Sequence, residues 1–159
     1  MTHLELLTRQ AEHLKTLLAP FALRVEVAGS VRRRAAHPND IEICMIPDPT
    51  KYFDLAQLLE EWRAQKGNPG GRYMRFGHTP AGSAPVDLFL LTRQNWGLLF
   101  FIRTGSAEFV QKAADKWVAM GYHSKDGILT REGVSIELPE EAAVFEFLKL
   151  PYVRPEYRL

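Results

Sequence analysis

The sequence predicts an α+β protein in two parts, an α/β half over residues 1–92 and a smaller α+β half over residues 93–159. Three observations favour this division. In the first half, strand-like alternation and helical periodicity follow one another along the chain. The nearly apolar segment "APVDLFLLT", residues 84–92, is typical of a buried central strand. After Thr92 the pattern changes to amphipathic helices and short strands with turn signals between them.

The first half begins with a predicted helix over residues 2–18, where six apolar side chains recur at helical spacing. Residues 23–30, "LRVEVAGS", alternate and predict a strand that runs into a Gly-Ser turn. Residues 40–48, "DIEICMIPD", predict a second strand, and the short arginine-rich link between the two predicts that they are neighbours in one sheet. A helix over residues 52–65 and a strand over residues 72–78 then precede the central strand.

The second half opens with "WGLLFFI", residues 96–102, an apolar run that fits either a helix or a strand. Residues 105–121 predict an amphipathic helix that ends at a glycine. Residues 122–138 predict strands that turn at an Asp-Gly and at a Glu-Gly pair. Residues 139–150 predict a last helix, whose first turn holds acidic residues that favour the helix dipole.

Composition limits the class of protein. The single cysteine, Cys44, excludes an internal disulfide and cysteine-based zinc sites. No apolar run approaches the roughly 18 residues that span a bilayer, and the N-terminus lacks a signal-peptide pattern. We therefore expect a cytoplasmic protein with no membrane partner. The net charge is only +1, so any attraction to phosphates must come from local clusters of basic residues.

One stretch combines such a cluster with acids: "VAGSVRRRAAHPNDIEI", residues 27–43. Asp40 and Glu42 are two apart in a predicted strand, so their side chains share one face about 6.5–7 Å apart. Asp87 stands alone among apolar neighbours, where an unpaired carboxylate costs several kcal/mol. Three convergent carboxylates without histidine or cysteine suit a hard cation such as Mg²⁺. Two such ions roughly 3.5–4 Å apart are typical of phosphoryl transfer.

The same stretch offers groups for phosphate binding. Backbone N–H groups of Gly29 and Ser30 follow a strand and can face an anion, and an arginine of the run 32–34 matches phosphate oxygens. Structural alternatives stay open at this point. The Gly-Ser step also fits an ordinary turn, and the arginine run fits a solvated face. A cap or an ion pair with an arginine would account for Asp87.

Four motifs, in order over nearly the whole chain, resemble those of family X DNA polymerases. "GSVRRRAAHPNDIE" resembles the family's nucleotide-binding signature, and "VDLFLL" resembles the strand that bears its third aspartate. "RTGSAEF" is similar to the Thr-Gly-Ser motif beside the incoming nucleotide. "LPEEAAVFEFLKLPYVRPEYR" is similar to the family's C-terminal ending. Glu42 departs from the pattern, which usually has aspartate there.

This resemblance implies a polymerase beta-like nucleotidyltransferase fold. A palm sheet with flanking helices would occupy residues 1–92, and a small α+β subdomain that binds nucleotide and DNA would occupy residues 93–159. The helix-hairpin-helix and lyase regions of larger members would be missing. The implied function is the transfer of dNMP from dNTP to a primer 3′-OH on primer–template or gapped DNA, in gap-filling repair, by a monomer.

The resemblance also assigns roles to residues. Two Mg²⁺ ions, or Mn²⁺ in their place, would be held by the catalytic residues Asp40, Glu42 and Asp87, and Asp87 would also accept the primer hydroxyl proton. Nucleotide would be bound by Gly29, Ser30, Arg33 and Gly105. Weaker candidates for binding the DNA backbone are Lys112, Lys116 and Arg131, since solvated lysines are commonplace on helices.

Two other functions stay open. A small nucleotidyltransferase that modifies RNA, a protein or a small molecule would share the Gly-Ser and the acidic pair, but we would not expect the Thr-Gly-Ser motif or the C-terminal ending. An inactive relative that only binds nucleic acid would be expected to lack at least one of the three acidic residues, whereas Asp40, Glu42 and Asp87 are all present.

Overall fold

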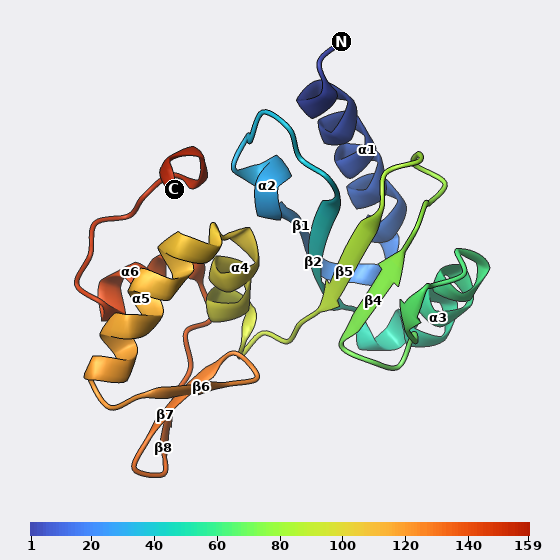
Figure 1. The fold of residues 1–159 in the computed structure, drawn as a ribbon. Coiled ribbons are helices and arrows are strands. Elements are labelled where there is room, and N and C mark those ends of the chain that lie inside the picture. The colour runs from blue at the N-terminus through green and yellow to red at the C-terminus, as the bar shows by residue number, and fades with distance from the viewer. The chain divides into compact units, whose positions relative to one another are not determined.

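The computed structural model describes all residues from 1 to 159. The chain forms two compact units (Figure 1), Met1–Leu91 and Thr92–Leu159. Each unit has its own hydrophobic core. None of the helices is both long and apolar enough to cross a membrane.

The first unit is built on a five-stranded sheet with the strand order β1-β2-β5-β4-β3. Only β2 and β5 pair in parallel, and the other neighbours are antiparallel. The central position of β5 confirms the interpretation of the apolar segment at residues 84–92, and the pairing of the first two strands is confirmed as well. The strands are β1 (Ala22–Ala28), β2 (Ile41–Pro47), β3 (Lys66–Gly67), β4 (Tyr73–Phe76) and β5 (Val86–Leu90).

The helices of this unit are α1 (His3–Leu18), α2 (Gly29–Arg32) and α3 (Tyr52–Glu61), with short 3₁₀ turns at Ala19–Phe21 and Pro49–Lys51. A capping box between Thr2 and Glu5 begins α1. The helix predicted over residues 52–65 is shorter than expected. It ends at Glu61 because Arg63 takes a left-handed backbone conformation, with φ of 57°.

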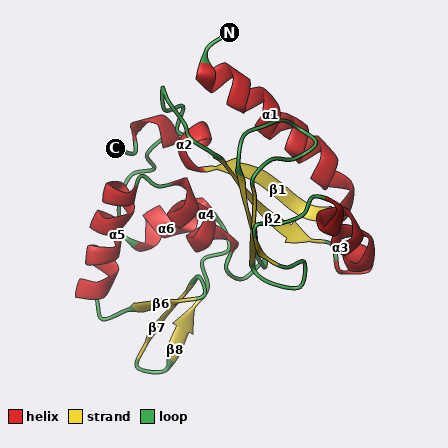
Figure 2. Cartoon of the chain, turned by 45° about the vertical axis from the view of Figure 1, so that its right-hand side comes forward, coloured by secondary structure: helices red, strands yellow, loops and turns green.

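The two faces of the sheet differ in character. On one face, apolar side chains of β2, β4 and β5 form the core together with those of α1 and α3, which lie along the same side of the sheet (Figure 2). In β2 these core residues are Ile41, Ile43 and Met45, all fully buried. Because side chains alternate along a strand, the residues between them point to the other face. Glu42 and, on β5, Asp87 therefore lie on the face away from the core.

The second unit holds the helices α4 (Trp96–Thr104), α5 (Ala107–Ala119) and α6 (Glu141–Phe147), and a 3₁₀ turn at Pro155–Tyr157. The apolar run at residues 96–102 thus belongs to a helix. A three-stranded antiparallel sheet is formed by β6 (His123–Lys125), β7 (Ile128–Arg131) and β8 (Val134–Ile136). Both predicted turns are confirmed. Each joins two of these strands, and both residues of each turn have positive φ.

The C-terminal tail is attached to α6 through Arg158, whose side chain is fully buried. Its Nη1 and Nη2 donate to the two carboxylate oxygens of Glu141 at 2.7 and 3.0 Å, and its Nε donates to the carbonyl of Val153 at 2.9 Å. The guanidinium also lies 5.1 Å from the centroid of the Phe145 ring and 5.4 Å from that of Tyr152. These contacts satisfy a charge that would otherwise be costly to bury.

Candidate metal and nucleotide site

Three carboxylates meet on the face of the first sheet that points away from the core. Strands β2 and β5 pair so that Glu42 lies directly beside Asp87. Asp40 comes two residues before Glu42 and so projects on the same side. One carboxylate oxygen from each of the three residues lies within 4.8 Å of the other two. The fold thereby brings the three predicted residues together, although Asp87 comes 45 positions after Glu42 in the sequence.

Strand β4 adds two side chains to this cluster. Arg75 lies opposite Asp87 in the antiparallel register. Its Nη1 donates to Asp87 Oδ2 at 2.9 Å and reaches Asp40 Oδ2 at 3.4 Å. The hydroxyl of Tyr73 donates to Asp87 Oδ1 at 2.5 Å. Both oxygens of the buried Asp87 side chain therefore accept a hydrogen bond from β4.

Sequence reasoning missed both of these residues. A signal was present in "YMRF", where two polar side chains alternate with two buried apolar ones. That alternation places Tyr73 and Arg75 on one face, opposite to the core face of Met74 and Phe76. The open alternative of an ion pair between Asp87 and an arginine is realised by Arg75, from a neighbouring strand rather than from the arginine run.

Electrostatics keep both β4 side chains in their donor forms. Burial raises the pKa of the Tyr73 hydroxyl, and the hydrogen bond to Asp87 and its negative charge raise it further. The hydrogen bond to Asp87 likewise raises the pKa of Arg75, as does the charge of that carboxylate. The ordinary pKa of each group is about 10 or higher. Near neutral pH, Tyr73 is thus a neutral donor and Arg75 a cation.

The donor atoms of this cluster fit a hard divalent cation. All three candidate ligands are carboxylates, and hard cations such as Mg²⁺ and Mn²⁺ prefer such oxygen ligands over softer ligands such as thiolates. Opposite ligands of a Mg²⁺ ion lie about 4.2 Å apart, twice the usual distance of about 2.1 Å, so a spread of up to 4.8 Å needs only small movements. The side chain of Asp40 is 32% exposed, which leaves the cluster open to solvent.

The Gly-Ser turn touches this cluster through Gly29. Its φ is 64°, a conformation that favours glycine, and a Cβ at this position would overlap the carboxylate of Glu42. Glycine therefore allows Glu42 to lie against the turn. Ser30 is half-buried within α2, and Arg33 is half-buried at the end of that helix, whereas Arg34 is exposed. The phosphate-binding role of Ser30 and Arg33 stays a prediction.

The other predicted binding residues belong to the second unit. Gly105 lies between α4 and α5 with φ of 71°. Lys112 and Lys116 are exposed one turn apart on α5. Arg131 already has a structural role, since its Nη1 donates to the carbonyl of Met120 at 3.1 Å and its guanidinium lies 4.7 Å from the centroid of the Tyr122 ring. Contacts of these residues with nucleotide or DNA stay predictions.

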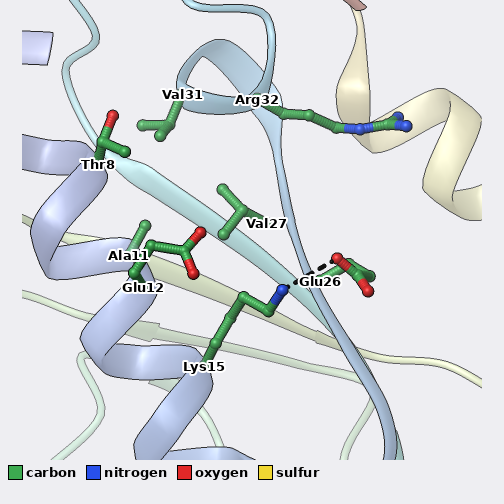
Figure 3. A pocket seen from close by; sticks show the side chains of 8 residues that line it. All are labelled: Thr8, Ala11, Glu12, Lys15, Glu26, Val27, Val31 and Arg32. Atoms are coloured by element: carbon green, nitrogen blue, oxygen red, sulfur yellow. Dashed lines mark hydrogen bonds and ion pairs between the residues drawn. The ribbon is translucent and has the colours of Figure 1, made fainter. Parts of the chain in front are cut away.

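A separate pocket of about 220 Å³ lies between α1, β1 and α2 (Figure 3). It contains the ion pair of Lys15 with Glu26, 3.2 Å apart, and Arg32 points away from α1. None of the three clustered carboxylates lines it, so it is not part of the candidate metal site. Its lining residues are Thr8, Ala11, Glu12, Lys15, Glu26, Val27, Val31 and Arg32.

Comparisons with known proteins agree with the resemblance seen in the sequence. Residues 99–159 match the family model for the DNA polymerase beta thumb. No curated protein sequence matches the chain significantly. Similar solved structures include Leishmania infantum polymerase beta as a ternary P/T complex and as a ternary gap complex. Sequence identity is 18% to each, and the TM-scores are 0.69 and 0.68.

The alignment covers 94% of this chain in both cases, and 72% and 66% of the two Leishmania chains. The chain thus spans roughly two thirds of those polymerases. The predicted α+β fold of the polymerase beta type is confirmed, with a five-stranded sheet and flanking helices. The chain thus resembles polymerase beta, a family X polymerase, in its fold, and its C-terminal residues match the thumb model of that polymerase.

Proposed function

We propose that this protein is a Mg²⁺-dependent nucleotidyltransferase that adds dNMP from dNTP to the 3′-OH of a DNA primer. The main support is the convergence of Asp40, Glu42 and Asp87 within 4.8 Å on a polymerase beta-like sheet. Three acids gathered without a divalent cation repel one another, and the guanidinium of Arg75, which pairs with Asp40 and Asp87, offsets part of that charge. A cation-binding role explains why the sheet brings them together.

The residues of the cluster have distinct tasks in this proposal. Asp40, Glu42 and Asp87 hold the divalent ions, which when bound neutralise phosphate charge and lower the pKa of the primer hydroxyl. Asp87 also accepts the proton of that hydroxyl. Each of its oxygens already accepts one hydrogen bond, and a carboxylate offers about four acceptor positions, so capacity remains for this proton.

The reaction is an in-line displacement at phosphorus. The 3′-oxygen of the primer bonds to the α-phosphorus of dNTP, the bond from that phosphorus to the α,β-bridging oxygen breaks, and pyrophosphate leaves. Ser30 and Arg33, next to the Gly29 turn, hold the β and γ phosphates. Gly105 lies under the sugar and base, and Lys112 and Lys116 contact the DNA backbone.

We propose gapped DNA as the preferred substrate, in keeping with gap-filling repair. The test is extension of a 5′-labelled primer by the full chain on gapped, nicked, recessed and single-stranded DNA, with dNTP or NTP. Each reaction is run with Mg²⁺, with Mn²⁺ and with EDTA. We expect extension with dNTP and a divalent cation, fastest on the gapped substrate.

A pair of matched variants connects activity to the cluster. Asp87→Asn keeps the size of the side chain but removes its charge and its proton-accepting ability, so extension should fall at least about a hundredfold. Asp54→Asn removes one charge from an exposed position on α3 and should leave extension unchanged. Extension by Asp87→Asn at the wild-type rate would refute the proposed function. Absence of extension by the wild-type chain on every substrate would refute it too.

A further inference from the structure

A single nitrogen of Arg75 lies between two of the three clustered acids. Its Nη1 is 2.9 Å from Asp87 Oδ2 and 3.4 Å from Asp40 Oδ2. A cation held by Asp40 and Asp87 would draw on the same two carboxylates. The guanidinium and a divalent ion therefore have overlapping partners.

The fold places Arg75 there through β4 and not through a mobile loop. Arg75 is paired with Asp87 across the β4–β5 ladder, and its neighbours Met74 and Phe76 are buried in the core. The backbone position is thus fixed, while the side chain is 27% exposed. Its guanidinium is carried on a flexible aliphatic chain that can turn toward solvent. Arg75 can leave the acids without any change in the sheet.

We propose that Arg75 is an internal counter-cation, which binds Asp40 and Asp87 in the metal-free protein and competes with the divalent ion for them. The proposal rests on the proposed function for the identity of the metal site. Arg75 would lower the repulsion among three acids when no metal is present. It would also weaken metal binding, because a positive charge disfavours a second cation among the same ligands.

An alternative role for Arg75 predicts the opposite effect on metal binding. If Arg75 only holds Asp87 in the orientation that the metal needs, its removal should weaken binding, by about 10–100-fold as for other supporting partners of metal ligands. If Arg75 competes with the metal, its removal should tighten binding. The direction of the change therefore separates the two roles.

The experiment is a Mn²⁺ titration of the full chain, in which free Mn²⁺ is followed by electron paramagnetic resonance. Wild type is compared with Arg75→Gln, which deletes the charge, and with Arg75→Lys, which keeps it. Arg9→Gln, which deletes an exposed charge on α1, is the matched control. We expect Arg75→Gln to bind Mn²⁺ at least about tenfold more tightly than wild type. A positive charge this close to a carboxylate weakens its binding of a proton by about tenfold or more, and we expect a similar effect on the binding of a metal cation. Arg75→Lys should stay within about threefold of wild type, and Arg9→Gln within about twofold.

Thermal unfolding gives a second measurement that does not depend on catalysis. Arg75→Gln should have a lower melting temperature than wild type in EDTA, because its acids lack the counter-cation. Saturating Mg²⁺ should raise its melting temperature by more than it raises that of wild type, since tighter binding to the folded state stabilises more.

The outcomes distinguish this proposal from the proposed function. Wild type that binds Mn²⁺, together with Arg75→Gln that binds it no more tightly, overturns the competition and leaves the metal site in place. A Mn²⁺ affinity of Arg75→Lys at least about tenfold below wild type would likewise assign Arg75 to positioning, and this result holds even if Arg75→Gln does not fold. Failure of wild type itself to bind Mn²⁺ would overturn the proposed metal function, and the competition with it.

Discussion

The hydroxyl of Tyr73 provides a test of how Asp87 is oriented. Tyr73→Phe removes only the oxygen that donates to Asp87 Oδ1 at 2.5 Å. The ring is kept, and with it the contact to Phe89, whose centroid lies 5.2 Å away. The half-buried position also stays filled. The substitution therefore isolates one hydrogen bond to a candidate metal ligand.

The expected magnitude follows from the kind of bond that is lost. A hydrogen bond to a charged group contributes about 1.5–3 kcal/mol, and about 1.4 kcal/mol corresponds to a factor of ten in binding. Loss of a supporting partner of a metal ligand typically costs about 10–100-fold in affinity, which is the same range. Unlike Arg75, Tyr73 is a neutral donor and does not compete with a cation. We therefore expect Tyr73→Phe to bind Mn²⁺ about 10–100-fold more weakly.

The measurement is the same Mn²⁺ titration, joined by primer extension over a series of Mg²⁺ concentrations. Extension by Tyr73→Phe should need a correspondingly higher Mg²⁺ concentration for half its maximal rate. Tyr52→Phe, which changes an exposed tyrosine at the start of α3, controls for loss of a hydroxyl elsewhere. A change in Mn²⁺ affinity smaller than about twofold would show that Tyr73 does not orient Asp87.

Three further predictions concern other parts of the chain. Arg33→Ala should weaken dNTP binding by about 1.5–3 kcal/mol, as for hydrogen bonds to charged groups, whereas substitution of the exposed Arg34 by Ala should change it by less than about 1 kcal/mol. Titration of each variant with nucleotide and Mg²⁺ compares the two, and a larger loss for Arg34→Ala would contradict the assignment of Arg33. Arg158→Met should lower the unfolding free energy of the second unit by about 3–5 kcal/mol, since it breaks a buried ion pair; urea unfolding followed by circular dichroism measures this, and a loss below about 1 kcal/mol would refute it. Hydrogen bonds from Thr50 hold the pKa of Asp48 below its ordinary value of 3.8, so the stability that this carboxylate contributes is present above pH 3.8 and is lost as the pH falls below it. Asp48→Asn should therefore lower the urea midpoint more at pH 7 than at pH 3, and an equal loss at both would contradict this pH dependence.

Local patterns in the sequence were sufficient for much of the fold. Alternation in "DIEIC" placed Asp40 and Glu42 on one face, because the side-chain period of a strand is fixed by its backbone. The Asp-Gly and Glu-Gly pairs predicted both turns of the second sheet, since such turns need positive φ at their central residues. The apolar surroundings of Asp87 predicted a buried strand. Helix ends were less well predicted, as the early end of α3 shows.

The partners of these residues were decided by tertiary structure. Glu42 lies beside Asp87 only because β2 and β5 pair in parallel with one particular register, which no local pattern specifies. Arg75 and Tyr73 reach Asp87 because β4 lies on the other side of β5. Backbone dihedral preferences act within a few residues and can be read from the sequence. Strand register depends on how whole elements pack over one core, so the complete constellation around Asp87 appears only in the folded chain.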